Sequence, residues 1–88
     1  DTRERMIFLR NRLATYENHV ATYYIERGAY VAALNRAKYA LEHFPGAPAI
    51  EGSLEIMITS YEQLGMLDLA NDARRVLDES FGDITAAD

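Results

Sequence analysis

Residues 24–33 read YIERGAYVAA, and residues 61–70 read YEQLGMLDLA. The tyrosine, the glycine and the final alanine of the first segment each recur 37 positions later, as does Phe44 at Phe81. A constant offset without insertions indicates one supersecondary unit used twice, and units of roughly 34 to 40 residues are typical of helical hairpin repeats. The sequence therefore predicts a repeat array whose function lies in its surfaces.

The segment before the first glycine predicts an unusually long helix from about Thr2 to Arg27. Apolar side chains recur there at steps of three and four, which places them on one face of an α-helix. They are Met6, Leu9, Leu13, Tyr16, Val20 and Tyr23. We expect this stripe to be the packed face of the helix. At 1.5 Å per residue the helix spans close to 40 Å, about twice an ordinary repeat helix, so its N-terminal half should overhang the body.

Three further helices are expected, over residues 30–43, 48–64 and 67–80. Gly28 and Gly65 suit the left-handed conformation at a helix C-terminus, because glycine adopts it without steric cost. Pro45 stops one helix and Pro48 suits the first turn of the next. We expect residues 83–88 to form a frayed tail, because they have little to bury.

Composition excludes several classes of function. The 88 residues make one domain, and the absence of cysteine removes disulfides and thiolate chemistry. The net charge of -5 opposes nucleic-acid binding, and no apolar run approaches the length of a membrane span. His19 and His43 lack a partner at metal-ligand spacing, and no nucleophile or phosphate loop is apparent. We therefore expect no catalytic site, metal or cofactor, and we interpret the chain as a fragment of a longer protein.

The pattern of helices and turns resembles the tetratricopeptide repeat, in which small residues sit at the helix crossing and proline closes the unit. Five positions of the first copy match: Gly28, Tyr30, Ala33, Ala40 and Pro45. The second copy matches at Gly65, Leu67 and Ala70, with Leu77 in place of alanine and Gly82 in place of proline. The resemblance implies an all-α superhelix of two stacked hairpins with an extended first helix, the first repeat over residues 1–45 and the second over residues 46–82.

A closer resemblance rests on residues 6–17, MIFLRNRLATYE, on residues 27–33, RGAYVAA, and on the pair Asn35-Arg36. These blocks are similar to the BamD family, lipoprotein subunits of the machinery (the BAM complex) that assembles β-barrel proteins in the Gram-negative outer membrane. The resemblance implies a non-enzymatic scaffold at the periplasmic face of that membrane. It identifies the chain with the last two of five repeats. The lipid anchor belongs to the full-length protein, so this piece itself should not insert into the membrane.

The resemblance also implies partners: the membrane-proximal periplasmic POTRA domain of BamA, and accessory lipoproteins of the complex. Arg36 is the first candidate for docking, because it lies at the edge of the packed face and matches the Asn-Arg pair of the family. A guanidinium suits bidentate recognition of a carboxylate. Arg10 and Arg12 are second candidates. The alternatives are a solvated charge for Arg36, and for the other two an exposed face or a contact with the missing third repeat.

Other features of the sequence have simpler interpretations. Five tyrosines at helical spacing are expected to pack in the core: Tyr16, Tyr23, Tyr24, Tyr30 and Tyr61. Glu51, Glu55 and Glu62 are expected on a solvated helix face. Gly52 within the third helix departs from the family pattern and costs roughly 1 kcal/mol relative to alanine. A different function also stays open, that of a tetratricopeptide adaptor gripping an extended peptide in its concave groove.

Overall fold

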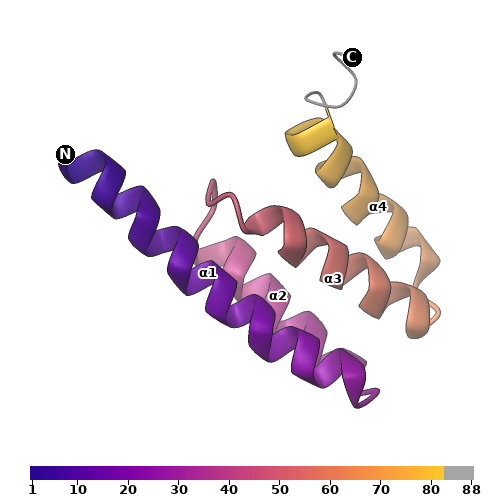
Figure 1. Cartoon of the computed structure of the whole chain (residues 1–88). Helices are drawn as coiled ribbons and strands as arrows, with labels where there is room; N and C mark the ends of the chain where they lie inside the picture. Colours follow the sequence, from indigo (N-terminus) through magenta and orange to yellow (C-terminus); the bar gives the residue numbers. More distant parts are fainter. Residues whose placement is uncertain (83–88) are drawn as a thin grey trace.

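The computed structural model describes residues 1–82, which form four α-helices and one π-helical turn (Figure 1). They are α1 (Thr2–Glu26), α2 (Tyr30–His43), α3 (Ile50–Gln63), α4 (Leu67–Leu77) and η1 (Asp78–Gly82). No strand occurs within these 82 residues. The fold is all-α and tetratricopeptide-like, as the sequence predicts. The predicted fraying of residues 83–88 lies outside the described residues.

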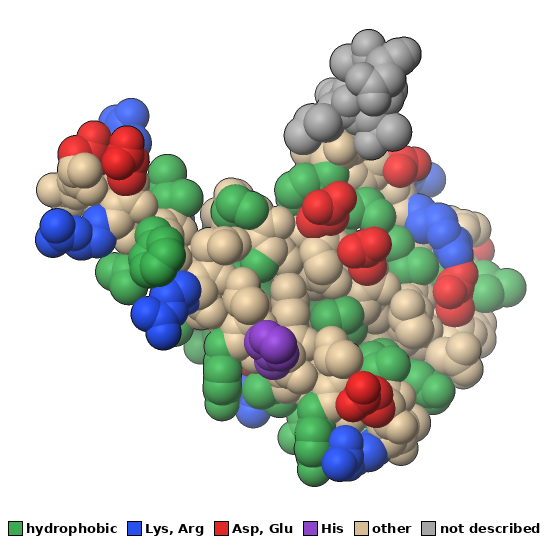
Figure 2. Space-filling model, viewed as in Figure 1, with side chains coloured by type: hydrophobic (Ala, Val, Ile, Leu, Met, Phe, Trp, Pro, Cys, Tyr) green, Lys and Arg blue, Asp and Glu red, His purple; other side chains and the backbone are tan. Residues whose placement is uncertain are grey.

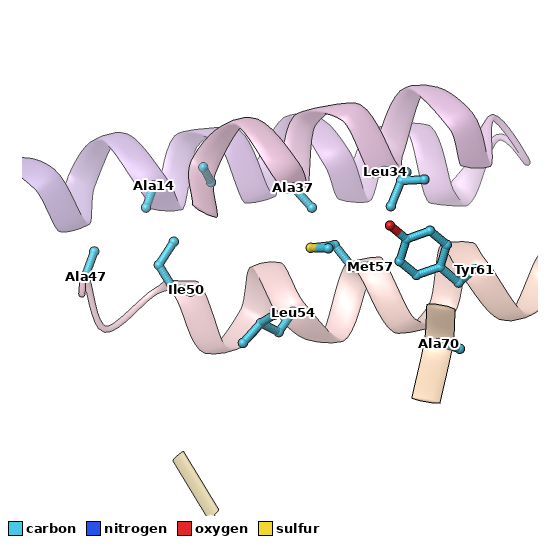
Figure 3. Packing of buried hydrophobic residues seen from close by; sticks show 10 residues of the cluster. Ala14, Leu34, Ala37, Ala47, Ile50, Leu54, Met57, Tyr61 and Ala70 are labelled. Atoms are coloured by element: carbon cyan, nitrogen blue, oxygen red, sulfur yellow. The ribbon is translucent and has the colours of Figure 1, made fainter. Parts of the chain in front are cut away.

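Each helix packs against the next along the chain, and α3 also contacts α1 (Figure 1). Fully buried alanines lie on the inner faces of α1 and α2, at Ala14 and Ala21 on the first helix and at Ala33, Ala37 and Ala40 on the second. Side chains this small let two helix axes approach closely. Larger residues of α3 fill the space between α2 and α3, where Met57 and Tyr61 point toward α2 (Figure 3).

The long first helix is confirmed, since its 25 residues extend over about 37 Å. Its N-terminal part projects beyond α2 and α3 (Figure 1), and residues 1–10 are all exposed. Figure 2 shows this projecting arm with both hydrophobic and charged side chains on its surface.

The predicted packed face of α1 is wrong. Met6, Leu9, Leu13, Tyr16 and Tyr23 are all exposed, Tyr16 to 62%, and Val20 is only half-buried. The buried residues of α1 are Ala14, Glu17 and Ala21, on a different face. The alanine-lined face is turned inward because it lets α2 and α3 lie close to α1, whereas large side chains would hold the helices apart. The apolar stripe is therefore left outside the core formed by residues 1–82.

The turns explain where the helices end. Gly28 and Gly65 have positive φ angles of 74° and 77°, as predicted. In both turns the residue after the glycine donates its N–H to the tyrosine carbonyl five residues back, at Tyr24 and Tyr61. The third helix begins at Ile50, two residues later than predicted, because residues 44–51 first form tight turns closed by i to i−3 hydrogen bonds. The fourth ends at Leu77, where η1 replaces the predicted last turn.

Candidate functional site

The first candidate residue, Arg36, is paired within the chain. Its Nη1 donates to Oε1 of Glu17 over 3.1 Å, which joins α2 to α1. The Glu17 side chain is only 11% exposed, whereas that of Arg36 is 46% exposed. The carboxylate is therefore enclosed in the seam and the guanidinium lies at its margin. A guanidinium carries five N–H donors, so one hydrogen bond to Glu17 leaves others for a second acceptor.

Sequence reasoning missed Glu17. The signal for it was present, because Glu17 follows Ala14 by three residues and precedes Ala21 by four. That spacing places a carboxylate on the small-residue face. A buried carboxylate needs a cation or a set of hydrogen bonds, so the alanine spacing would have predicted both its burial and a basic partner.

The second hairpin shows that its seam does not require an ion pair. Shifted by the 37-residue period, Glu17 corresponds to Leu54 and Arg36 corresponds to Ala73. Leu54 and Ala73 are both buried. The same two places thus hold apolar side chains in the second hairpin and a charge pair in the first. Replacing a buried ion pair by apolar residues is often neutral or stabilising. Stability alone therefore gives little reason for the charge pair in the first hairpin.

A shallow hollow opens beside the guanidinium, between α1 and α2. We call it the Arg36 hollow, and its lining residues are Tyr24, Ala32, Asn35, Arg36 and Tyr39. The Tyr39 ring lies 4.0 Å from that of His43 and 6.3 Å from that of Phe44, and the Tyr24 ring meets that of Tyr23 edge to face. These contacts hold both aromatic walls. The hollow therefore offers a cation, an amide and two tyrosines to an approaching side chain.

Arg10 and Arg12 lie elsewhere, on the exposed part of α1. Arg10 borders a mainly apolar hollow on the projecting arm, together with Thr2, Arg3, Met6 and Ile7. The guanidinium carbon of Arg12 lies 6.0 Å from the centre of the Phe8 ring. Neither arginine lines the Arg36 hollow, so the three candidates do not form one cluster.

A polar seam between α1 and α3 is the second feature that sequence reasoning missed. Asn11 accepts the N–H of Ala49 at 2.7 Å, and Asn18 donates to the carbonyl of Ala49 at 2.9 Å. Asn18 also accepts a hydrogen bond of 2.6 Å from the hydroxyl of Ser53. Two asparagines seven residues apart thus hold the first turn of α3. A Cβ on Gly52 would lie 3.2 Å from the Asn18 amide nitrogen, so a larger residue there would require the Asn18 side chain to shift.

Of the five tyrosines expected in the core, some are buried and others are not. Tyr61 is buried and Tyr24 and Tyr30 are half-buried, but Tyr16 and Tyr23 are exposed, so the expected core position is wrong for these two. Glu62 is exposed yet forms an ion pair with Arg74 of α4. Within residues 1–82 no three His, Asp or Glu side chains come together as a metal site, and no helix has the length and hydropathy to cross a bilayer.

Comparison with known proteins points to one family. The family model YfiO, described as "Outer membrane lipoprotein", matches residues 1–77. The outer membrane protein assembly factor BamD of Neisseria meningitidis serogroup A is 42% identical over 81 residues, which is 92% of this chain and 30% of that protein. BamD of Vibrio cholerae is 36% identical over 77 residues, covering 88% of this chain and 32% of that protein. The chain spans about a third of the length of these relatives, and it belongs to the YfiO family of outer membrane lipoproteins.

Proposed function

We propose that this chain is a non-enzymatic scaffold of the β-barrel assembly machinery, at the periplasmic face of the outer membrane. Its relatives are named outer membrane protein assembly factors, and the match covers nearly the whole chain. In this proposal α1 and α2 dock onto the membrane-proximal POTRA domain of BamA, and Arg36 meets an acidic side chain there. The observation that carries the proposal is the charge pair at a place where the second hairpin is apolar.

The exposed stripe of α1 supports a further part of the proposal, the division into stacked repeats. Leu13 and Val20 correspond, 37 residues on, to Ile50 and Met57, which are buried in the core between α2 and α3. The face of α3 that a preceding hairpin covers is thus matched on α1 by an apolar face with nothing over it in residues 1–82. Exposed apolar patches of this kind mark interfaces. We propose that a third repeat of the longer protein packs there, with Arg10 and Arg12 at its margin.

The docking site is tested by introducing into the first hairpin the two apolar residues that the second hairpin has at the corresponding positions. The variant Glu17→Leu with Arg36→Ala removes both charges together, so no buried carboxylate is left unpaired and the fold should persist. Isothermal titration against the POTRA domain should show at least a 30-fold loss of affinity, since an interface arginine of this kind contributes about 2 kcal/mol or more. Arg75→Ala, which removes an exposed arginine of α4, is the matched control and should bind normally.

Two outcomes separate the parts of this proposal. If the unaltered chain does not bind the POTRA domain, the proposed function is wrong. If the chain binds and the double variant keeps the same affinity while remaining helical by circular dichroism, docking occurs but does not use Arg36.

A further inference from the structure

The Glu17–Arg36 pair has a geometry that decides how Arg36 can meet a partner. Glu17 is enclosed between α1 and α2, and its hydrogen bond comes from Arg36. If Arg36 swung away to a partner, that carboxylate would stay in the seam without a counter-charge. Leaving one member of a buried pair unpaired is strongly unfavourable. The guanidinium should therefore keep its bond to Glu17 while its other N–H groups, on the exposed side, meet the partner.

A free arginine side chain loses rotamer freedom when it is immobilised in an interface, and this loss weakens binding. An arginine already held by a carboxylate loses less. The walls of the Arg36 hollow are held in the same way, because Tyr39 contacts His43 and Phe44. The guanidinium and the Tyr39 wall of the hollow are thus already held in the free chain.

Resting on the proposed function, we propose that Glu17 is a positioning residue for docking. Its carboxylate fixes Arg36 so that the exposed N–H groups of the guanidinium donate to one acidic side chain of the partner, which lies between Tyr24 and Tyr39. The partner's acid completes an arrangement in which one guanidinium bridges two carboxylates, one from each protein. Glu17 itself, being enclosed, does not touch the partner.

The bridging role distinguishes two variants of Glu17. Glu17→Gln keeps an oxygen that accepts from Arg36 but removes the negative charge, whereas Glu17→Ala removes the acceptor. If Glu17 acts by holding Arg36, Glu17→Gln should bind the POTRA domain within about threefold of the unaltered chain. Glu17→Ala should bind about tenfold more weakly, which corresponds to about 1.4 kcal/mol. If Glu17 mattered only as a charge beside Arg36, both variants would bind an acidic partner more tightly, and the inference would be wrong.

A double-mutant cycle separates positioning from general stability. In an Arg36→Gln background, which keeps a neutral amide donor for Glu17 but no guanidinium, adding Glu17→Ala should change affinity by less than twofold, because there is no guanidinium left to hold. An equal tenfold loss in both backgrounds would mean that Glu17 supports the fold only. Thermal unfolding of each variant records how much of any loss is structural.

A readout without partner keeps this inference separate from the proposed function. The heteronuclear NOE of the Arg36 Nε–H group in the free chain should report an ordered side chain in the unaltered protein and in Glu17→Gln, and a mobile one in Glu17→Ala. The same mobility in all three would overturn the positioning role even if the POTRA domain binds. The POTRA domain could also fail to bind while Arg36 is ordered only with glutamate or glutamine at position 17. That result would overturn the docking role and leave the Glu17–Arg36 hydrogen bond as a structural contact.

Discussion

Asn18 shows how one side chain sets the fit between two helices. Its amide donates to the Ala49 carbonyl and its oxygen accepts from Ser53, so both halves of the side chain are used by the start of α3. Because the amide is held at both ends, it moves little to make room for a neighbour. Gly52 lies against it, where an added Cβ would come within 3.2 Å. A glycine that is unfavourable for an isolated helix is therefore suited to this packed one.

The fit between Gly52 and Asn18 predicts a dependence between two substitutions. Gly52→Ala in an Asn18→Ala background should stabilise the chain by about 1 kcal/mol, the difference in helix propensity between glycine and alanine. In the unaltered chain the same substitution should give no gain, because the Asn18 amide opposes it. Urea unfolding of the four proteins measures the coupling. Equal gains in both backgrounds would show that Asn18 does not constrain Gly52.

The helices could be predicted closely from sequence, because turn glycines, prolines and apolar spacing are local signals. The bounds of α2 are those predicted, and α1 ends one residue early. The packed face of α1 could not be predicted in the same way. Hydrophobic periodicity shows which face avoids water but not which neighbour covers it, and the apolar stripe of α1 is not the face that meets α2. The alanine spacing with Glu17 carried that information.

The glycine in the turn that joins α1 to α2 should affect the stability of the chain. Gly28 has φ of 74° with open space around its α-carbon, so a substitution there meets backbone strain and no clash. Gly28→Ala should lower the free energy of unfolding by about 1–2 kcal/mol. Gly28→Asn should lower it by less, since asparagine tolerates the left-handed region better. Denaturant titration distinguishes them, and equal stability of all three proteins would contradict the role given to this turn.

The two ends of the whole molecule differ in chemistry. On α3, the positions that correspond to Ala14 and Asn18 of α1 are Glu51 and Glu55, both exposed. A hairpin stacked on that side would bury two carboxylates, whereas one stacked on α1 would bury the apolar stripe. The outward face of α3 therefore suits water and that of α1 suits a helical neighbour. The Arg36 hollow lies between α1 and α2, in the hairpin whose residues 1–44 hold seven Lys and Arg against five Asp and Glu.

In the proposed function the first hairpin docks a folded partner, and an acidic side chain of that partner enters the Arg36 hollow. The decisive measurement is ¹H–¹⁵N chemical-shift mapping of the labelled 88-residue chain during addition of the unlabelled POTRA domain of BamA. Docking through the hollow should concentrate the chemical-shift changes at Tyr24, Ala32, Asn35, Arg36 and Tyr39, with only small changes along α4. Shifts on α1 and α3 upon addition of extended peptides, with none upon addition of the POTRA domain, would contradict it and favour a peptide-binding adaptor.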